Sequence, residues 1–138
     1  MAASLGHVVY LLGMLPARWN RPVGQVAQLV AAATHHQFIR VLFGPTGQPV
    51  ACVIWAFPSP EVQRRLAENP NYVLHESEWD EGGSLWILDM IAPFGNLRQV
   101  LRELRQTTFA RQSLVQFAHD KPARGFRQVV SRRLAPLV

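Results

Sequence analysis

Cysteine, lysine and long apolar runs are scarce in this 138-residue sequence. A single cysteine, Cys52, excludes an internal disulfide and is compatible with a reducing compartment. No stretch of 18 uninterrupted apolar residues occurs, so no membrane-spanning helix is expected. The first 16 residues are apolar but lack the basic segment of a secretory signal, and they contain His7. We therefore expect a cytoplasmic protein without a membrane span.

Positive charge is abundant, and almost all of it is arginine. Residues 96–138 carry eight Arg and one Lys against two acids, whereas residues 1–95 carry five Arg against seven acids. A basic C-terminal third favours an anionic partner, but an arginine-rich composition also produces simply solvated surfaces. Nucleic acid is the weakest of the anionic candidates because aromatic residues are sparse in that third, and we expect none to bind.

The hydrophobic pattern predicts one domain over residues 1–138 that mixes helices and strands. The fold class that follows is α+β, with a mixed, mostly antiparallel sheet flanked by helices. Ser59 and Pro60 have the residue types of a helix cap and first helical position. We expect helices over residues 4–15, 23–36, 60–68 and 96–106. We expect strands over residues 37–43, 50–57, 85–92, 114–118 and 126–131, a further strand and turn within 72–83, and a turn at 119–122.

The predicted strand at residues 85–92 is apolar except for Asp89, and Pro93 and Gly95 follow it. Burial of an ionised carboxylate is costly unless it is paired, so a strand of this kind normally excludes Asp. Either donors hold Asp89 in a structural role, or it faces a cleft and takes part in chemistry. The residues alone do not decide between these two roles of Asp89.

Several segments, taken together, resemble the toxin-activating lysine acyltransferases, the hemolysin-activating enzymes of RTX toxin systems. The strongest segment is Trp86-Ile87-Leu88-Asp89-Met90-Ile91-Ala92-Pro93-Phe94-Gly95. It is accompanied by Leu5-Gly6-His7, Pro16 with Pro22-Val23, Gln37-Phe38, and the residues from Pro49-Val50-Ala51 to Trp55-Ala56. The order and spacing agree over residues 5–110, about three-quarters of the chain.

The resemblance implies a fold like that of the Gcn5-related N-acetyltransferases. It also implies transfer of a fatty acyl group from acyl carrier protein to a lysine of a protoxin, by a His and an Asp. The Asp matches Asp89, but the position of the His, two residues after Pro16, holds Arg18. A guanidinium stays charged and cannot act as a general base, although it can bind an anion or stabilise an oxyanion.

The remaining expectations concern partners and cofactors. Because Arg18 replaces the family histidine, a relative that binds acyl carrier protein without transferring an acyl group is the alternative function. No histidine has the spacing of a metal site with Cys or acid partners, so we expect no metal. An uncovered sheet edge would favour a homodimer.

We expect no tightly bound cofactor. The donor's acyl-phosphopantetheine is expected at Pro93, Phe94, Gly95 and Asn96, acyl carrier protein at Arg98, Arg102 and Arg105, and the acyl chain near Trp19.

Overall fold

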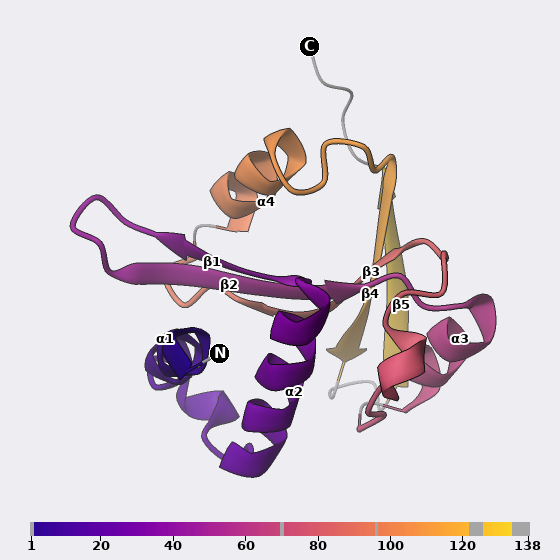
Figure 1. The fold of residues 1–138 in the computed structure, drawn as a ribbon, viewed down its shortest axis with the longest axis horizontal. Coiled ribbons are helices and arrows are strands. Elements are labelled where there is room, and N and C mark those ends of the chain that lie inside the picture. The colour runs from indigo at the N-terminus through magenta and orange to yellow at the C-terminus, as the bar shows by residue number, and fades with distance from the viewer. Residues whose placement is uncertain (1, 70, 96, 122–125, 134–138) are drawn as a thin grey trace. The chain divides into compact units, whose positions relative to one another are not determined.

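The computed structural model describes residues 2–69, 71–95, 97–121 and 126–133, which form helices and strands in mixed order (Figure 1). The α-helices are α1 (Ala2–Leu12), α2 (Val23–His36), α3 (Pro60–Glu68) and α4 (Leu97–Gln106), with short 3-10 helices at Pro16–Arg18 and Glu76–Glu78. The strands are β1 (Ile39–Phe43), β2 (Pro49–Ala56), β3 (Leu85–Ile91), β4 (Leu114–Lys121) and β5 (Phe126–Arg133).

The chain divides into two compact units, and β2, β3 and α4 each contribute residues to both. One unit comprises residues 1–55 and 89–103, and the other comprises residues 56–88 and 104–138. The β3 boundary lies directly before Asp89, which therefore belongs to the first unit. Organisation as one domain stays a prediction.

In the first unit, α1 and α2 pack against each other and both contact β1 (Figure 1). Val26, Val30 and Ala33 of α2 are buried because helical spacing places them on one face. The helix ends where Gln37 adopts a left-handed backbone (φ 63°), and the Phe38 N–H donates to the Ala33 carbonyl at 2.9 Å. β1 follows directly and pairs antiparallel with β2, as the predicted hairpin requires.

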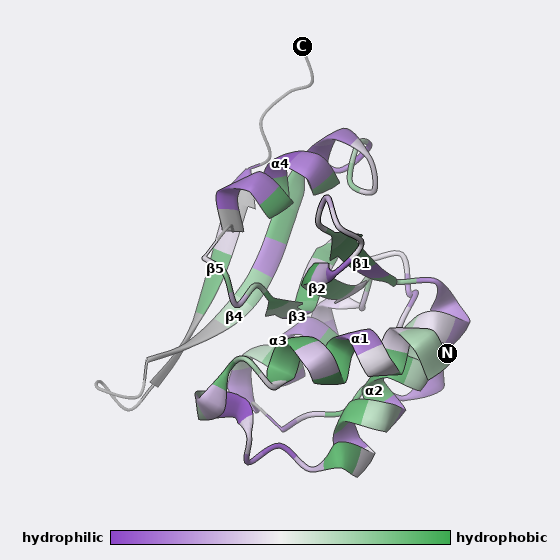
Figure 2. Cartoon of the chain, turned by 90° about the vertical axis from the view of Figure 1, so that its left-hand side faces the viewer, coloured by the Kyte–Doolittle hydropathy of each residue, from purple (hydrophilic) through white to green (hydrophobic). Residues whose placement is uncertain are grey.

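In the second unit, Leu85 and Trp86 at the start of β3 pair parallel with β4, and β4 pairs antiparallel with β5. Helix α3 contacts both β4 and β5. Its buried residues Val62 and Leu66 pack with Trp86, whereas Glu61, Arg64 and Glu68 of the same helix are exposed. Figure 2 shows the hydropathy of each residue along the chain. The Ser59 hydroxyl accepts a hydrogen bond from the Val62 N–H at 3.3 Å, which confirms the predicted N-cap.

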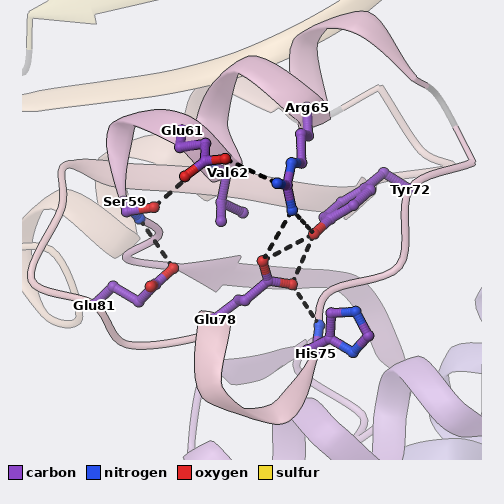
Figure 3. A network of polar contacts seen from close by, with 8 residues as sticks. All are labelled: Ser59, Glu61, Val62, Arg65, Tyr72, His75, Glu78 and Glu81. Carbon is purple, nitrogen blue, oxygen red and sulfur yellow. Dashed lines mark hydrogen bonds and ion pairs between the residues drawn. The ribbon is translucent and has the colours of Figure 1, made fainter.

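The predicted strand within residues 72–83 is wrong, because a polar network organises this segment as a loop (Figure 3). Glu78 is buried and caps the 3-10 helix by accepting from the His75 N–H at 2.8 Å. The Tyr72 hydroxyl contacts both Glu78 oxygens at 2.8 and 2.9 Å, and Arg65 lies 3.8 Å from one of them. The contacts of this one carboxylate, with Tyr72 and His75 of the same segment and with Arg65, therefore hold the segment as a loop and not as the predicted strand.

The predicted turn at residues 119–122 is also wrong. Residues 119–121 continue β4, because each pairs with a residue of β5 down to Lys121 opposite Phe126. The residue types of His119 and Asp120 favour a turn, yet pairing with the neighbouring strand holds their backbone extended. Pro122 lies outside the described residues.

The α+β class is confirmed, and of the three strand pairings described here two are antiparallel and one is parallel. Likeness to the Gcn5-related N-acetyltransferases stays a prediction. Among the described residues, no helix has the length and apolar character needed to cross a membrane.

Candidate functional site

Asp89, near the end of β3, accepts hydrogen bonds from two arginines of the loop that joins α1 to α2. The Arg18 Nη1 donates to Asp89 Oδ1 at 2.9 Å, and the Arg21 Nη1 donates to Asp89 Oδ2 at 2.6 Å. All three residues belong to the first unit. The carboxylate side chain is only 5% exposed, whereas Arg18 and Arg21 are 36% and 35% exposed. A buried anion is thus neutralised by two cations that remain open to solvent.

The loop itself explains why both arginines reach one carboxylate. Successive turns hold it, because the Arg18 N–H donates to the Leu15 carbonyl at 2.8 Å and the Arg21 N–H donates to the Arg18 carbonyl at 3.2 Å. Pro16 begins the 3-10 helix and Pro22 caps α2, so both ends of the loop have restricted backbones. In this compact path, side chains three positions apart point to the same side.

Trp19 lies between the two arginines and exposes 65% of its surface. Its indole N–H donates to the Gly13 carbonyl at 3.2 Å, which fixes the ring. Val23, at the start of α2, is 73% exposed. Apolar surface therefore borders the arginine pair in the sequence. The expected role of Trp19 in an acyl pocket stays a prediction.

Cys52, in β2, is fully buried in the same unit. Burial and, to a smaller extent, the negative charge of Asp89 raise the pKa of its thiol to about 12. The thiol is therefore protonated at neutral pH and is no nucleophile. Trp55, Trp79 and Trp86 are buried like Cys52, so these side chains pack in the interior.

Comparison with known proteins places this sequence in a family. The model of the HlyC family, described as the RTX toxin acyltransferase family, matches residues 1–132. The chain belongs to the RTX toxin acyltransferase family.

Three similar proteins illustrate the range of sequence identity and of matched length. The chain is 31% identical over 103 residues to the protein-lysine myristoyltransferase HlyC of Escherichia coli, covering 74% of this chain and 58% of that protein. It is 36% identical over 63 residues to the lysine-acyltransferase RtxC of Vibrio cholerae, covering 46% and 40% respectively. An uncharacterized Synechocystis protein, sll0720, is 24% identical over 128 residues, covering 92% and 86%. The match thus spans about half the length of the two named acyltransferases.

Arg21 is the site residue that sequence reasoning missed. The resemblance to the RTX toxin acyltransferase family directed attention to Arg18, where the family His is expected. Two features of the sequence carry the signal for Arg21: its spacing of three from Arg18, and a single Asp in an apolar strand that needs counter-charge.

The residues expected to receive the donor's phosphopantetheine form a turn after β3. Gly95 has a φ of 71°, a left-handed backbone that glycine adopts without strain, and its N–H donates to the Ala92 carbonyl at 3.3 Å. Phe94 is exposed on this turn, and Pro93 is half-buried. Asn96 lies outside the described residues. Donor binding here stays a prediction.

The three arginines expected to dock acyl carrier protein lie along α4, but they have different environments. Arg98 and Arg102 are exposed. The Arg105 Nη1 donates to the carbonyls of Phe109 and Ala110 at 3.2 and 2.9 Å, so it also holds the turn after the helix. A role of Arg98, Arg102 and Arg105 in docking acyl carrier protein stays a prediction.

Histidines do not contribute to the described contacts of Asp89, whose hydrogen-bond partners are both guanidinium groups. His7 instead packs edge-on against Phe43, with ring centroids 5.0 Å apart. His35 and His36 lie in the last turn of α2. Within the part of the chain that the structure describes, no group of three or more His, Cys, Asp or Glu side chains is arranged to hold a metal ion.

Proposed function

We propose that this protein is a protein-lysine fatty acyltransferase that acts in the cytoplasm. It transfers an acyl chain from acyl carrier protein to an internal lysine of an RTX-type protoxin. Membership of the RTX toxin acyltransferase family supports the reaction class. The observation that carries the proposal is Asp89, a buried carboxylate at the end of β3 that joins two solvent-accessible guanidinium groups.

The chemistry requires a neutral amine and a stabilised oxyanion. The lysine nitrogen attacks the thioester carbon, the phosphopantetheine thiolate leaves, and the nitrogen loses a proton as the amide forms. Because lysine has a pKa near 10.4, a base must remove a proton from the ammonium. Arg18 cannot be that base, but its remaining N–H groups can donate to the oxyanion.

The geometry gives Asp89 a positioning role in this scheme. Each carboxylate oxygen already accepts a hydrogen bond from a guanidinium, and an incoming ammonium would be repelled by the two cations beside it. Asp89 therefore orients Arg18 and Arg21, and the proton leaves to another group or to water.

The test is acylation by the purified protein. Acyl carrier protein loaded with medium to long chains is mixed with a protoxin peptide, and lysine acylation is read by mass spectrometry. We expect turnover that falls at least about 100-fold in Asp89→Ala, the scale of losing oriented electrostatic donors. Glu103→Ala, an exposed acid of the same unit, is the matched control and retains activity. No acylation above background by the wild-type protein would refute the proposal.

A second candidate is a relative that binds acyl carrier protein without transfer. The arginine at position 18, where the family resemblance expects His, favours it, as does the occupation of both Asp89 oxygens. Under this alternative the wild-type protein is inactive, and Arg18→His restores measurable acylation because an imidazole can accept the proton. Turnover by the wild-type protein would exclude this candidate.

A further inference from the structure

The outer face of α1 presents an apolar surface without charge to solvent. No Asp, Glu, Lys or Arg occurs in residues 1–17. Val9 and Tyr10 are large side chains of this face, and they are 49% and 48% exposed. The exposed residues of the helix and of its continuation are Ala2, Ala3, Gly6, Val9, Tyr10 and Gly13. Keeping such a surface in water is unfavourable, so an apolar ligand that covers it gains free energy.

Trp19 joins this face to the arginine pair on Asp89. Its indole N–H donates to the Gly13 carbonyl at 3.2 Å, and the Gly13 N–H donates to the Val9 carbonyl at 2.9 Å. The ring, which is 65% exposed, therefore lies against the C-terminal end of α1. Arg18 directly precedes it in the chain and donates to Asp89. The apolar surface thus begins next to the guanidinium group that stabilises the oxyanion in the proposed reaction.

The length of this face suits a fatty acyl chain. Helix α1 has 11 residues, which span about 16 Å at the rise of an α-helix. An extended acyl chain of medium to long length has a similar dimension. A Cβ at Gly6 would meet no atom within 4 Å, so a chain can approach the backbone of the helix there.

The chemistry of the face also selects an uncharged ligand. Methylene groups carry no charge and form no hydrogen bonds, so they lose no polar interaction when they leave water. An anionic membrane or an acidic protein would need cations on this face, and residues 1–17 supply neither Lys nor Arg. A fatty chain that starts at Arg18 is therefore favoured over these partners.

We propose that the outer face of α1, from Trp19 and Gly13 back to Gly6, binds the acyl chain of the donor thioester and sets the chain-length preference of the transfer. The inference rests on the proposed function for the identity of the donor, but it concerns binding and not turnover. The thioester carbonyl at Arg18 is bonded directly to the chain, so the two binding sites are contiguous. The outer face of α1 extends the expected contact of the chain with Trp19.

The experiment measures the affinity of the full chain for acyl carrier protein that carries an octanoyl, dodecanoyl or hexadecanoyl group, in the absence of protoxin. Unloaded acyl carrier protein is the reference. We expect the hexadecanoyl form to bind at least about tenfold tighter than the octanoyl form, because more methylenes are covered. Quenching of tryptophan fluorescence by acrylamide should decrease on binding. This signal reports mainly on Trp19, since the other three tryptophans are buried.

Two variants locate the chain along the face. Gly6→Glu places a carboxylate about 10 Å from Gly13 along the helix, beyond the reach of the shorter chain. It should weaken hexadecanoyl binding at least about fivefold and leave octanoyl binding unchanged, because a charge that an apolar chain covers loses its water. Trp19→Ser, at the start of the path, should weaken binding of all three chains.

The matched control is Gly24→Glu, the same change at an exposed helical glycine of the same unit. A Cβ has open space at both Gly6 and Gly24, so both variants should fold. Gly24→Glu should leave all three affinities unchanged. Circular dichroism of each variant verifies the fold.

Affinity that does not depend on chain length would overturn the proposal, and so would an equal loss for all chains in Gly6→Glu or a loss in Gly24→Glu. If Gly6→Glu instead abolishes binding to phosphatidylglycerol vesicles, or dissociates a dimer in light scattering, while acyl-chain affinities are unchanged, the face belongs to a membrane or to a second copy. Chain-length-dependent binding that Gly6→Glu removes, without any lysine acylation, would refute the transferase reaction and leave this site standing. Lysine acylation whose chain-length preference Gly6→Glu leaves unaltered would refute this site and leave the proposed function standing.

Discussion

Arg21 and Asp89 lie 68 positions apart in the sequence, and their side chains form an ion pair with an N–O distance of 2.6 Å. Together with Arg18 on the other oxygen, this pair explains how an apolar strand tolerates a buried carboxylate. The carboxylate is satisfied by side chains whose outer ends remain accessible. The same contact therefore stabilises the folded chain and leaves the outer ends of two guanidinium groups accessible for chemistry.

The first prediction concerns the cooperativity of this ion-pair cluster. Arg18→Ala or Arg21→Ala alone leaves Asp89 with one cation and should lower the free energy of unfolding by about 1 kcal/mol. The double variant leaves a buried carboxylate without a partner and should cost about 3–5 kcal/mol, more than the sum of the two. Urea denaturation measures all three variants.

The control for this prediction is the pair of Arg40 and Glu103, which are 3.7 Å apart and well exposed. Alanine at both positions should cost less than about 1 kcal/mol and be additive. Additive losses at Arg18 and Arg21 would contradict the shared role of Asp89.

The second prediction concerns Cys52, whose pKa of about 12 is due first to burial and then to Asp89. In the native protein at pH 8, its reaction with Ellman's reagent should be at least about 100-fold slower than in denaturant. Asp89→Asn should change the native rate only slightly, because burial is the larger cause. Fast labelling of the folded wild-type protein would show that the thiol is accessible.

The third prediction concerns the acid stability of the second unit. Burial raises the pKa of the Glu78 carboxyl, but the His75 N–H, the Tyr72 hydroxyl and the charge of Arg65 outweigh it and lower this pKa below its ordinary value of 4.5. A lowered folded-state pKa contributes stability above pH 4.5, and this contribution is lost as the pH falls further.

Glu78→Gln should accordingly reduce stability at neutral pH by about 1–2 kcal/mol and flatten the loss of stability in acid. Denaturation curves between pH 7 and about pH 3 measure the effect. Glu76→Gln, a change of the same charge at an exposed position of the same 3-10 helix, is the control. An unchanged acid slope in Glu78→Gln would contradict the assigned cause.

The fourth prediction concerns Gly83, whose N–H donates to the Phe57 carbonyl at 3.3 Å. A Cβ at this position would overlap the Pro58 carbonyl oxygen, which is backbone and cannot rotate away. Gly83→Ala should therefore cost about 2–3 kcal/mol of unfolding free energy. Gly24→Ala, in α2 with open space around the new methyl group, should be neutral or stabilising by up to about 1 kcal/mol. An unchanged melting temperature in Gly83→Ala would contradict this prediction, because it would show that the backbone around Gly83 moves to accommodate the methyl group.

Much of the secondary structure was predictable because its causes are local. Helix α2 spans the predicted residues, since Pro22 presets its start and the apolar positions repeat at helical spacing. The cap at Ser59 and the hairpin of β1 and β2 follow from similar local signals. The predictions for residues 72–83 and 119–121 are wrong because specific contacts decide their backbone: the hydrogen bonds of the buried Glu78 in the first segment and pairing with β5 in the second.

Some features of the candidate site follow from the sequence, and others depend on the tertiary structure. The sequence by itself determined the family resemblance, and it determined that Asp89 sits in an apolar strand and needs counter-charge, because desolvation of a carboxylate depends on residue type and pattern alone. Only the tertiary structure decided which cations supply that charge. Arg18 and Arg21 reach Asp89 because the loop after α1 and the end of β3 meet in one unit. A contact across 68 residues depends on chain folding, and no local pattern encodes it.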